Sequence, residues 1–80
     1  MGTSEEVLLV VPQMGVVEEV VVLEWLVEDG AEVRKGDSVV VVETEKADTE
    51  LEAPASGRIE ILIPAGDDEV SVGHALARIL

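Results

Sequence analysis

Glycine and proline interrupt this chain at short intervals, and the segments between them have the length of β-strands. The interrupting residues are Gly15, Gly30, Gly36, Pro54, Gly57, Pro64, Gly66 and Gly73. No window between them shows the 3.6-residue apolar period of a helix. The chain's sixteen valines favour pleated strands, because a β-branched side chain is stiff at χ1. The sequence therefore predicts an all-β sandwich or barrel.

An internal repeat relates the two halves of the chain. Residues 30–36 are similar to residues 66–73, with one extra residue in the second copy, and an expected strand lies on either side of each. This pattern predicts two strand layers related by a pseudo-two-fold axis, with Val33 and Val70 filling the core between turns. The alternative is chance recurrence in a chain rich in valine and glycine. The expected strands cover residues 7–11, 20–27, 39–43, 48–53, 58–63 and 75–80.

Composition excludes several classes of function. The chain has 80 residues, enough for one small domain, and its net charge of −13 argues against partners such as nucleic acid or an anionic membrane. There is no cysteine, which excludes disulfides and thiol chemistry, and His74 is the only imidazole, so no catalytic triad can form. The acidic run at residues 67–69 lacks the spaced ligands of a calcium loop. We therefore expect neither an enzyme nor a metal site.

One segment has chemical interest because a single cation lies among five carboxylates. This segment, residues 43–52, contains Lys46 between two expected strands, so residues 45–47 are expected at the tip of a hairpin although no Asn-Gly or Asp-Gly marks the turn. The pseudo-two-fold axis would place Lys46 at the end opposite both termini. A lysine projecting from a turn suits covalent modification, and the carboxylates suit the steering of a basic partner. The alternative is a solvated lysine that relieves acidic repulsion.

Together with its surroundings, this segment resembles the lipoyl domain of 2-oxo acid dehydrogenase complexes. Such domains occur in the dihydrolipoamide acyltransferase (E2) component and form part of the biotinyl/lipoyl attachment family. The E-T-D-K-A box of the family is matched at residues 43–47, with Glu45 in place of aspartate. Further matches to family motifs lie at residues 25–30, 33–37, 53–57 and 70–73.

The resemblance implies a fold and a modification. The fold is a flattened β-barrel or sandwich of two four-stranded antiparallel sheets with pseudo-two-fold symmetry, a barrel-sandwich hybrid. Residues 6–80 would form this single domain, and residues 1–5 would be disordered or derived from cloning. Lys46, flanked by Glu45 and Ala47, would carry lipoic acid in amide linkage.

The resemblance also implies a role and partners. A lipoate ligase or lipoyl transferase would load the lysine. The swinging arm would then shuttle acyl groups and reducing equivalents between a thiamine diphosphate-dependent 2-oxo acid decarboxylase, an acyltransferase core and dihydrolipoyl dehydrogenase. The domain would be a non-catalytic part of a dihydrolipoyllysine-residue acyltransferase, in the bacterial cytoplasm or the mitochondrial matrix.

Recognition of the decarboxylase would involve the loop before the second strand. This stretch, residues 12–20, is about one residue shorter than usual and has Val20 where the family normally has glycine. The expected recognition residues are Val16, Val17, Glu18, Glu43 and Asp48. For the two valines, packing beneath the loop is an equal alternative.

Two other functions remain open at this stage. A biotinyl carrier domain of a biotin-dependent carboxylase shares the fold and the tip lysine, but usually has methionine on both sides, where this chain has Glu45 and Ala47. An unmodified β interaction module would have a Lys46 that is never acylated.

Overall fold

The computed structural model describes residues 6–13, 15 and 18–80, and all of its regular structure is β-strand. The strands are β1 (Val7–Val10), β2 (Glu19–Trp25), β3 (Glu32–Val33), β4 (Ser38–Glu43), β5 (Asp48–Glu52), β6 (Gly57–Ile61), β7 (Glu69–Ser71) and β8 (Ala75–Ile79). The six expected strands are confirmed, with ends that differ by one or two residues. The prediction for residues 1–5 lies outside the described residues. Within the described part of the chain, no helix is long and apolar enough to cross a membrane.

Two strands, β3 and β7, occur where the sequence predicted only turns. They contain two and three residues, which is too short for an alternating apolar pattern to be recognised. The prediction that their valines fill the core is confirmed, because Val33 and Val70 are both buried.

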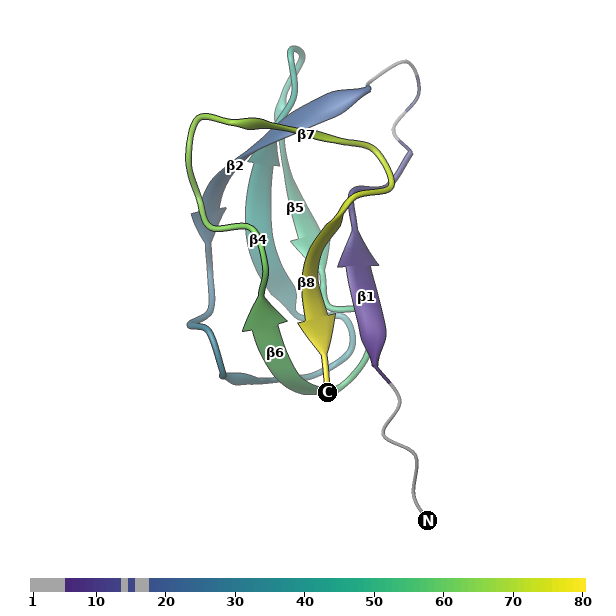
Figure 1. Cartoon of the computed structure of the whole chain (residues 1–80), viewed down its shortest axis with the longest axis vertical. Coiled ribbons are helices and arrows are strands. Elements are labelled where there is room, and N and C mark those ends of the chain that lie inside the picture. Colours follow the sequence, from purple (N-terminus) through teal and green to yellow (C-terminus); the bar gives the residue numbers. More distant parts are fainter. Residues whose placement is uncertain (1–5, 14, 16–17) are drawn as a thin grey trace.

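The eight strands form two antiparallel sheets, which pack face to face in a flattened sandwich (Figure 1). One sheet has the strand order β1-β8-β6-β3 and the other has the order β5-β4-β2-β7. Exchanging β1 with β5, β8 with β4, β6 with β2 and β3 with β7 converts one sheet into the other. No ladder between the described residues of the two sheets closes them into a barrel. The predicted all-β fold with pseudo-two-fold symmetry is confirmed.

Hydrogen bonds between the sheets obey the same symmetry. The Gly30 amide after β2 donates to the Ile59 carbonyl of β6 over 2.8 Å, and the Gly66 amide after β6 donates to the Val22 carbonyl of β2 over 3.0 Å. The first glycine of each repeat copy thus bonds to a strand of the sheet opposite to the strand that precedes it. The repeat therefore reflects the architecture and not a chance recurrence.

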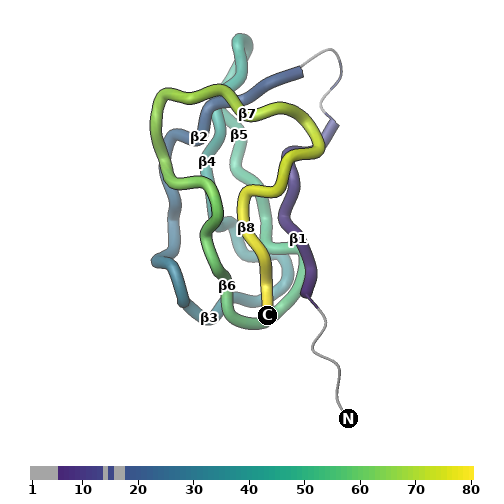
Figure 2. Tube along the Cα trace, in the orientation of Figure 1, coloured from purple at the N-terminus to yellow at the C-terminus, as the bar shows by residue number. Residues whose placement is uncertain are grey.

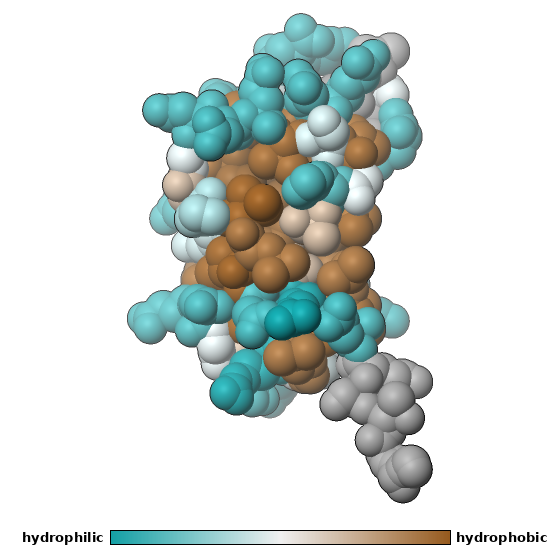
Figure 3. All heavy atoms as spheres, viewed as in Figure 1, coloured by the Kyte–Doolittle hydropathy of each residue, from teal (hydrophilic) through white to brown (hydrophobic). Residues whose placement is uncertain are grey.

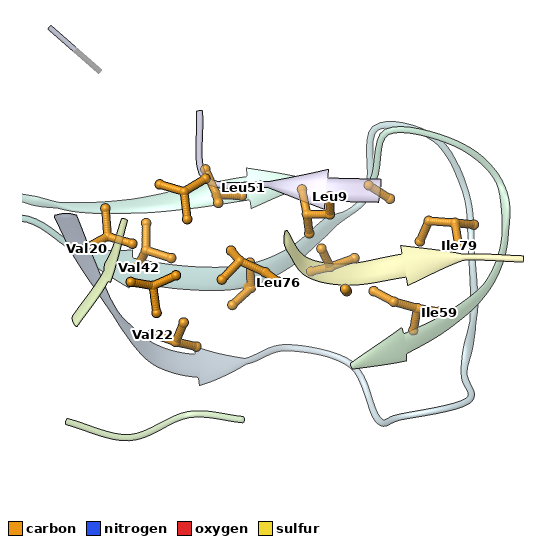
Figure 4. Close-up of a cluster of buried hydrophobic side chains, with 14 of the residues drawn as sticks. Leu9, Val20, Val22, Val42, Leu51, Ile59, Leu76 and Ile79 are labelled. Carbon is orange, nitrogen blue, oxygen red and sulfur yellow. The ribbon is translucent and has the colours of Figure 1, made fainter. Parts of the chain in front are cut away.

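Bulges in β4 and β8, two of the register shifts in the described sheets, increase the number of side chains that enter the core. The register of β4 against β5 shifts between Ser38 and Val40, so the consecutive residues Val39 and Val40 are both fully buried. The related shift between β1 and β8 has the same effect on Leu76 and Ala77. Figure 4 shows side chains from both sheets meeting in this core, and no buried residue of the described chain is polar.

Trp25, the only aromatic residue of the chain, lies at the edge of the core and not at its centre. Its ring is partly buried against the core, and its indole N–H donates to the Ile63 carbonyl over 2.8 Å. The side chain therefore joins the end of β2 to the segment that follows β6. The central positions are instead filled by aliphatic side chains, which the bulges bring together.

The outer face of β1, β8 and β6 carries a broad apolar area (Figure 3). Leu8, Val10 and Leu62 are exposed, with exposed fractions of 46%, 37% and 42%. Arg78 on β8 forms salt bridges with Glu60 on β6 and with Glu6, the latter over 3.1 Å. The hydrogen bond and charge of Glu60 raise the pKa of Arg78 above its already high ordinary value, so the arginine stays charged.

Gly57 at the start of β6 has no room for a side chain. Its φ is +152°, and an added Cβ would lie 2.4 Å from the Leu80 carbonyl oxygen. We predict that Gly57→Ala lowers the free energy of unfolding by about 2–3 kcal/mol, because it combines a backbone clash with an unfavourable φ. Gly66→Ala is the matched control, since an added Cβ there meets no atom within 4 Å, and it should change stability by less than about 0.5 kcal/mol. Urea denaturation followed by circular dichroism measures both, and equal stability of the two variants would contradict the prediction.

We predict that Trp25→Ala destabilises the domain by about 2–3 kcal/mol. This is below the roughly 3–5 kcal/mol of a fully buried tryptophan, because the ring is only partly buried. Trp25→Phe, which removes the indole donor, should cost about 1 kcal/mol. Leu26→Ala, at a neighbouring side chain that is 42% exposed, should change stability by less than about 0.5 kcal/mol. A Trp25→Ala variant as stable as Leu26→Ala in the same denaturation experiment would show that the ring does not stabilise the fold.

Candidate functional site

The candidate site is the β-hairpin of β4 and β5, whose ladder ends at the facing pair Glu43 and Asp48. Residues 44–47 connect the two strands, so the predicted hairpin with Lys46 at its tip is confirmed. Figure 2 shows this tip at one end of the molecule and the start of β1 with Leu80 at the other end. The expected separation of Lys46 from the ends of the domain is therefore observed.

Thr44 closes the turn at the tip with its hydroxyl and its backbone N–H. Thr44 Oγ1 accepts hydrogen bonds from the backbone N–H groups of Lys46 and Ala47, each over 3.2 Å, and donates to the Ala47 carbonyl over 2.9 Å. The Thr44 backbone N–H also donates to that carbonyl, over 3.0 Å. Both backbone polar groups of Ala47 are thus bonded to Thr44.

This turn differs from the two-residue hairpin turns that Asn-Gly and Asp-Gly sequences form. Those turns require positive φ, whereas no non-glycine residue in the described chain has a positive φ, Glu45 and Lys46 included. The usual turn residues are absent from this sequence because a side-chain hydroxyl supplies the hydrogen bonds of the turn instead.

Lys46 projects into solvent from this turn. Its side chain is exposed, as are those of Glu45 and Ala47, and the salt bridges found among the described residues do not involve it. A primary amine in this position is accessible to an enzyme that forms an amide bond.

The other lysine of the chain, Lys35, provides a natural comparison. It is also exposed, but it lies between β3 and β4 at the opposite end of the molecule (Figure 2). Its backbone N–H donates to Ser56 Oγ over 2.9 Å, and the next residue is Gly36 with a φ of +96°. The two lysines therefore share exposure and differ in the turn that presents them.

An acidic hollow of about 550 Å³ lies beside the hairpin tip. It is lined by Glu18, Glu19, Val20, Val21, Glu43, Thr44, Glu45 and Glu69. Two of the predicted recognition residues, Glu18 and Glu43, thus come together, whereas the lining does not include Asp48, which is exposed at the start of β5. The predictions for Val16 and Val17 lie outside the described residues. Val20, which stands where the family normally has glycine, is buried inside β2, as the expected strand 20–27 implied.

Sequence reasoning missed Glu19 and Glu69 as part of this hollow. Glu69 belongs to β7, which pairs with β2 and so brings residues from the second half of the chain next to the hairpin. The internal repeat was the available signal, because it relates β7 to β3, but the shortness of β7 concealed the strand.

The Glu69 carboxylate perturbs that of Glu19. The pKa of Glu19 is raised above the ordinary value of glutamate, chiefly by a side-chain hydrogen bond with Glu69. Charge repulsion from Glu69 is the second cause, and Glu18 adds a smaller repulsion. The folded state therefore binds this proton more tightly than the unfolded chain does. It follows that this pair destabilises the fold at neutral pH and that acidification through the raised pKa removes the effect.

We predict that Glu69→Gln returns the pKa of Glu19 toward its ordinary value. The substitution removes the repelling charge and the shared proton. A side-chain carbon NMR titration measures this pKa, and Asp68→Asn in the adjacent turn is the control that should leave it unchanged. The stability gained on acidification through the raised pKa of Glu19 should also be smaller in Glu69→Gln than in the wild type. An unchanged Glu19 titration in Glu69→Gln would contradict the assignment.

Comparison with known proteins identifies the class to which this fold and hairpin belong. The model of the family described as "Biotin-requiring enzyme" matches residues 7–79, nearly the whole chain. The chain therefore belongs to the biotinyl/lipoyl attachment family, whose domains carry a covalently bound group.

The curated relatives point to the lipoyl branch of this family. A dihydrolipoyllysine-residue acetyltransferase component of the pyruvate dehydrogenase complex from Rhizobium meliloti is 39% identical over 75% of this chain. The protein of the same description from Mycobacterium bovis is 40% identical over 98% of the chain. A pyruvate dehydrogenase E1 component subunit beta from Rhizobium meliloti is 39% identical over 79% of it. In each case the chain spans only 14% of the relative's length.

The hairpin fits a covalently attached lipoyl group. Amide linkage requires a solvent-accessible primary amine, and the exposed Lys46 supplies one in the turn between β4 and β5. Among the described residues, no group of three or more histidine, aspartate or glutamate side chains could hold a metal ion.

Proposed function

We propose that this domain is a lipoyl carrier in which Lys46 holds lipoate as a swinging arm. The observation that carries the proposal is the exposed lysine at the tip of the β4–β5 hairpin, flanked by Glu45 and Ala47. The attached group would supply the dithiolane chemistry of acyl transfer and oxidation–reduction, which a chain without cysteine cannot supply itself.

The protein's own residues would present the arm and attract its partners. The two sheets form a rigid support, and the turn holds the attachment point about as far as possible from the other end of the domain. The carboxylates of the acidic hollow create a negative potential beside the arm. Such a potential favours encounter with a basic surface on a partner enzyme.

The proposed partners are those that the names of the relatives support. We propose that the domain serves a 2-oxo acid dehydrogenase complex, between a thiamine diphosphate-dependent decarboxylase, an acyltransferase core and dihydrolipoyl dehydrogenase. The descriptions of the relatives include both an acetyltransferase component and an E1 subunit of such a complex. Glu18 and Glu43 in the hollow, with Asp48, Val16 and Val17, are the proposed recognition residues for the decarboxylase. A lipoate ligase or lipoyl transferase would load the domain, and the proposed location is the bacterial cytoplasm or the mitochondrial matrix.

We predict that co-expression with a lipoate ligase adds the mass of one lipoyl group to the chain, at Lys46. Intact-mass spectrometry gives the number of groups, and peptide mapping gives their position. Lys46→Arg should abolish the addition, because arginine keeps the charge but lacks an amine that the ligase can acylate. Lys35→Arg is the matched control and should be modified to the same extent as the wild type.

The same co-expression experiment, repeated with a biotin ligase, distinguishes the alternative functions. Addition of biotin by a biotin ligase, without addition of lipoate, would make the protein a biotinyl carrier domain. Absence of either group, under conditions that modify a known lipoyl domain, would contradict the carrier function and leave an unmodified interaction module. Lipoylation of Lys46→Arg at Lys35 would contradict the site.

A further inference from the structure

We propose that Thr44 is a positioning residue for the loading of Lys46, whose hydroxyl holds the tip of the hairpin in the conformation that a lipoate ligase accepts. This inference rests on the proposed carrier function. It gives a role in loading to a residue that does not contact the reacting atoms. It follows from the hydrogen bonds of the turn and from the charges at the end of the hairpin ladder.

The hydroxyl uses its full bonding capacity within the turn. A threonine hydroxyl has one donor and two acceptor positions, and Thr44 Oγ1 makes one donated and two accepted hydrogen bonds to Lys46 and Ala47. These bonds fix the backbone on both sides of the Lys46 side chain. The direction in which Lys46 leaves the hairpin is therefore set by Thr44.

The sequence around the turn gives little other support for this conformation. The turn contains neither glycine nor asparagine, and the last pair of the ladder places Glu43 directly opposite Asp48. Like charges that face each other across strands destabilise a hairpin. Glu45 adds a third carboxylate at the tip. Without the hydroxyl, repulsion among these groups would favour opening of the turn.

The loading reaction requires the amine of Lys46 to be held at a defined position. The ammonium of Lys46 first loses a proton to its surroundings. Its Nζ then forms an amide bond with the carboxyl carbon of a lipoyl adenylate, the mixed anhydride that a ligase makes from ATP and lipoate. The bond from that carbon to the phosphate oxygen breaks, AMP leaves with the electron pair, and the second amine proton is released to solvent. If only part of the population holds the correct turn, the apparent affinity of the ligase falls by that fraction.

The test compares Thr44→Val, which has the same shape without the hydroxyl, with Thr44→Ser, which keeps it. Thr49→Val on β5 is the matched control, because Thr49 belongs to the same hairpin and makes none of these bonds. For Thr44→Val we expect a KM for the domain about tenfold higher in lipoylation by the ligase, with kcat within about twofold of the wild type. Tenfold corresponds to about 1.4 kcal/mol. Thr44→Ser and Thr49→Val should remain within about twofold in both constants.

A second readout is independent of the ligase. The backbone amides of Lys46 and Ala47 should exchange with solvent faster in Thr44→Val than in the wild type and Thr44→Ser, while the rest of the hairpin keeps its protection. Kinetics and exchange in Thr44→Val that match those of the wild type would overturn the inference and leave the carrier function intact. A wild-type chain that the ligase does not modify would overturn both. A fall in kcat with unchanged KM would also overturn it, because it would place Thr44 in the chemical step.

Discussion

Packing of the two sheets against each other across an aliphatic core is the interaction on which the rest of the molecule depends. Valine, leucine and isoleucine side chains fill the core, and the bulges in β4 and β8 each turn two consecutive side chains inward. Inter-sheet hydrogen bonds from Gly30 and Gly66 hold the two halves in their symmetric arrangement. Because this support is formed without the tip of the β4–β5 hairpin, the tip is free for a function that needs exposure.

The two halves have equivalent strand arrangements but differ in surface chemistry. The outer face of β1, β8 and β6 is largely apolar, with Arg78 held by two carboxylates. The hairpin end is acidic, with a hollow in which Glu69 raises the pKa of Glu19. Such a distribution suits a domain that presents one modified lysine to larger partners, because the charge that attracts a basic surface lies next to the attachment point.

Much of this could be predicted from the sequence. Glycine, proline and valine define the six longer strands, and the repeat predicts the pseudo-symmetry. Lys46 is found because a lone cation lies in a family-like box between two strands. β3 and β7 are missed because two or three residues show no periodicity, and Glu69 enters the hollow only through β7. The edge position of Trp25 depends on bulges that leave no local signal, and the role of the Thr44 hydroxyl depends on atomic positions within the turn.

The central claim is that the hairpin-tip amine bears the prosthetic group in the organism that makes the protein. The most direct measurement is mass spectrometry of the protein purified from its own source, with a protease that cleaves at glutamate, so that Lys46 is read in a peptide separate from Lys35. The result predicted here is one lipoyl amide on Lys46 and an unmodified Lys35. A bare Lys46 amine in protein from cells whose other lipoyl domains are loaded would contradict it.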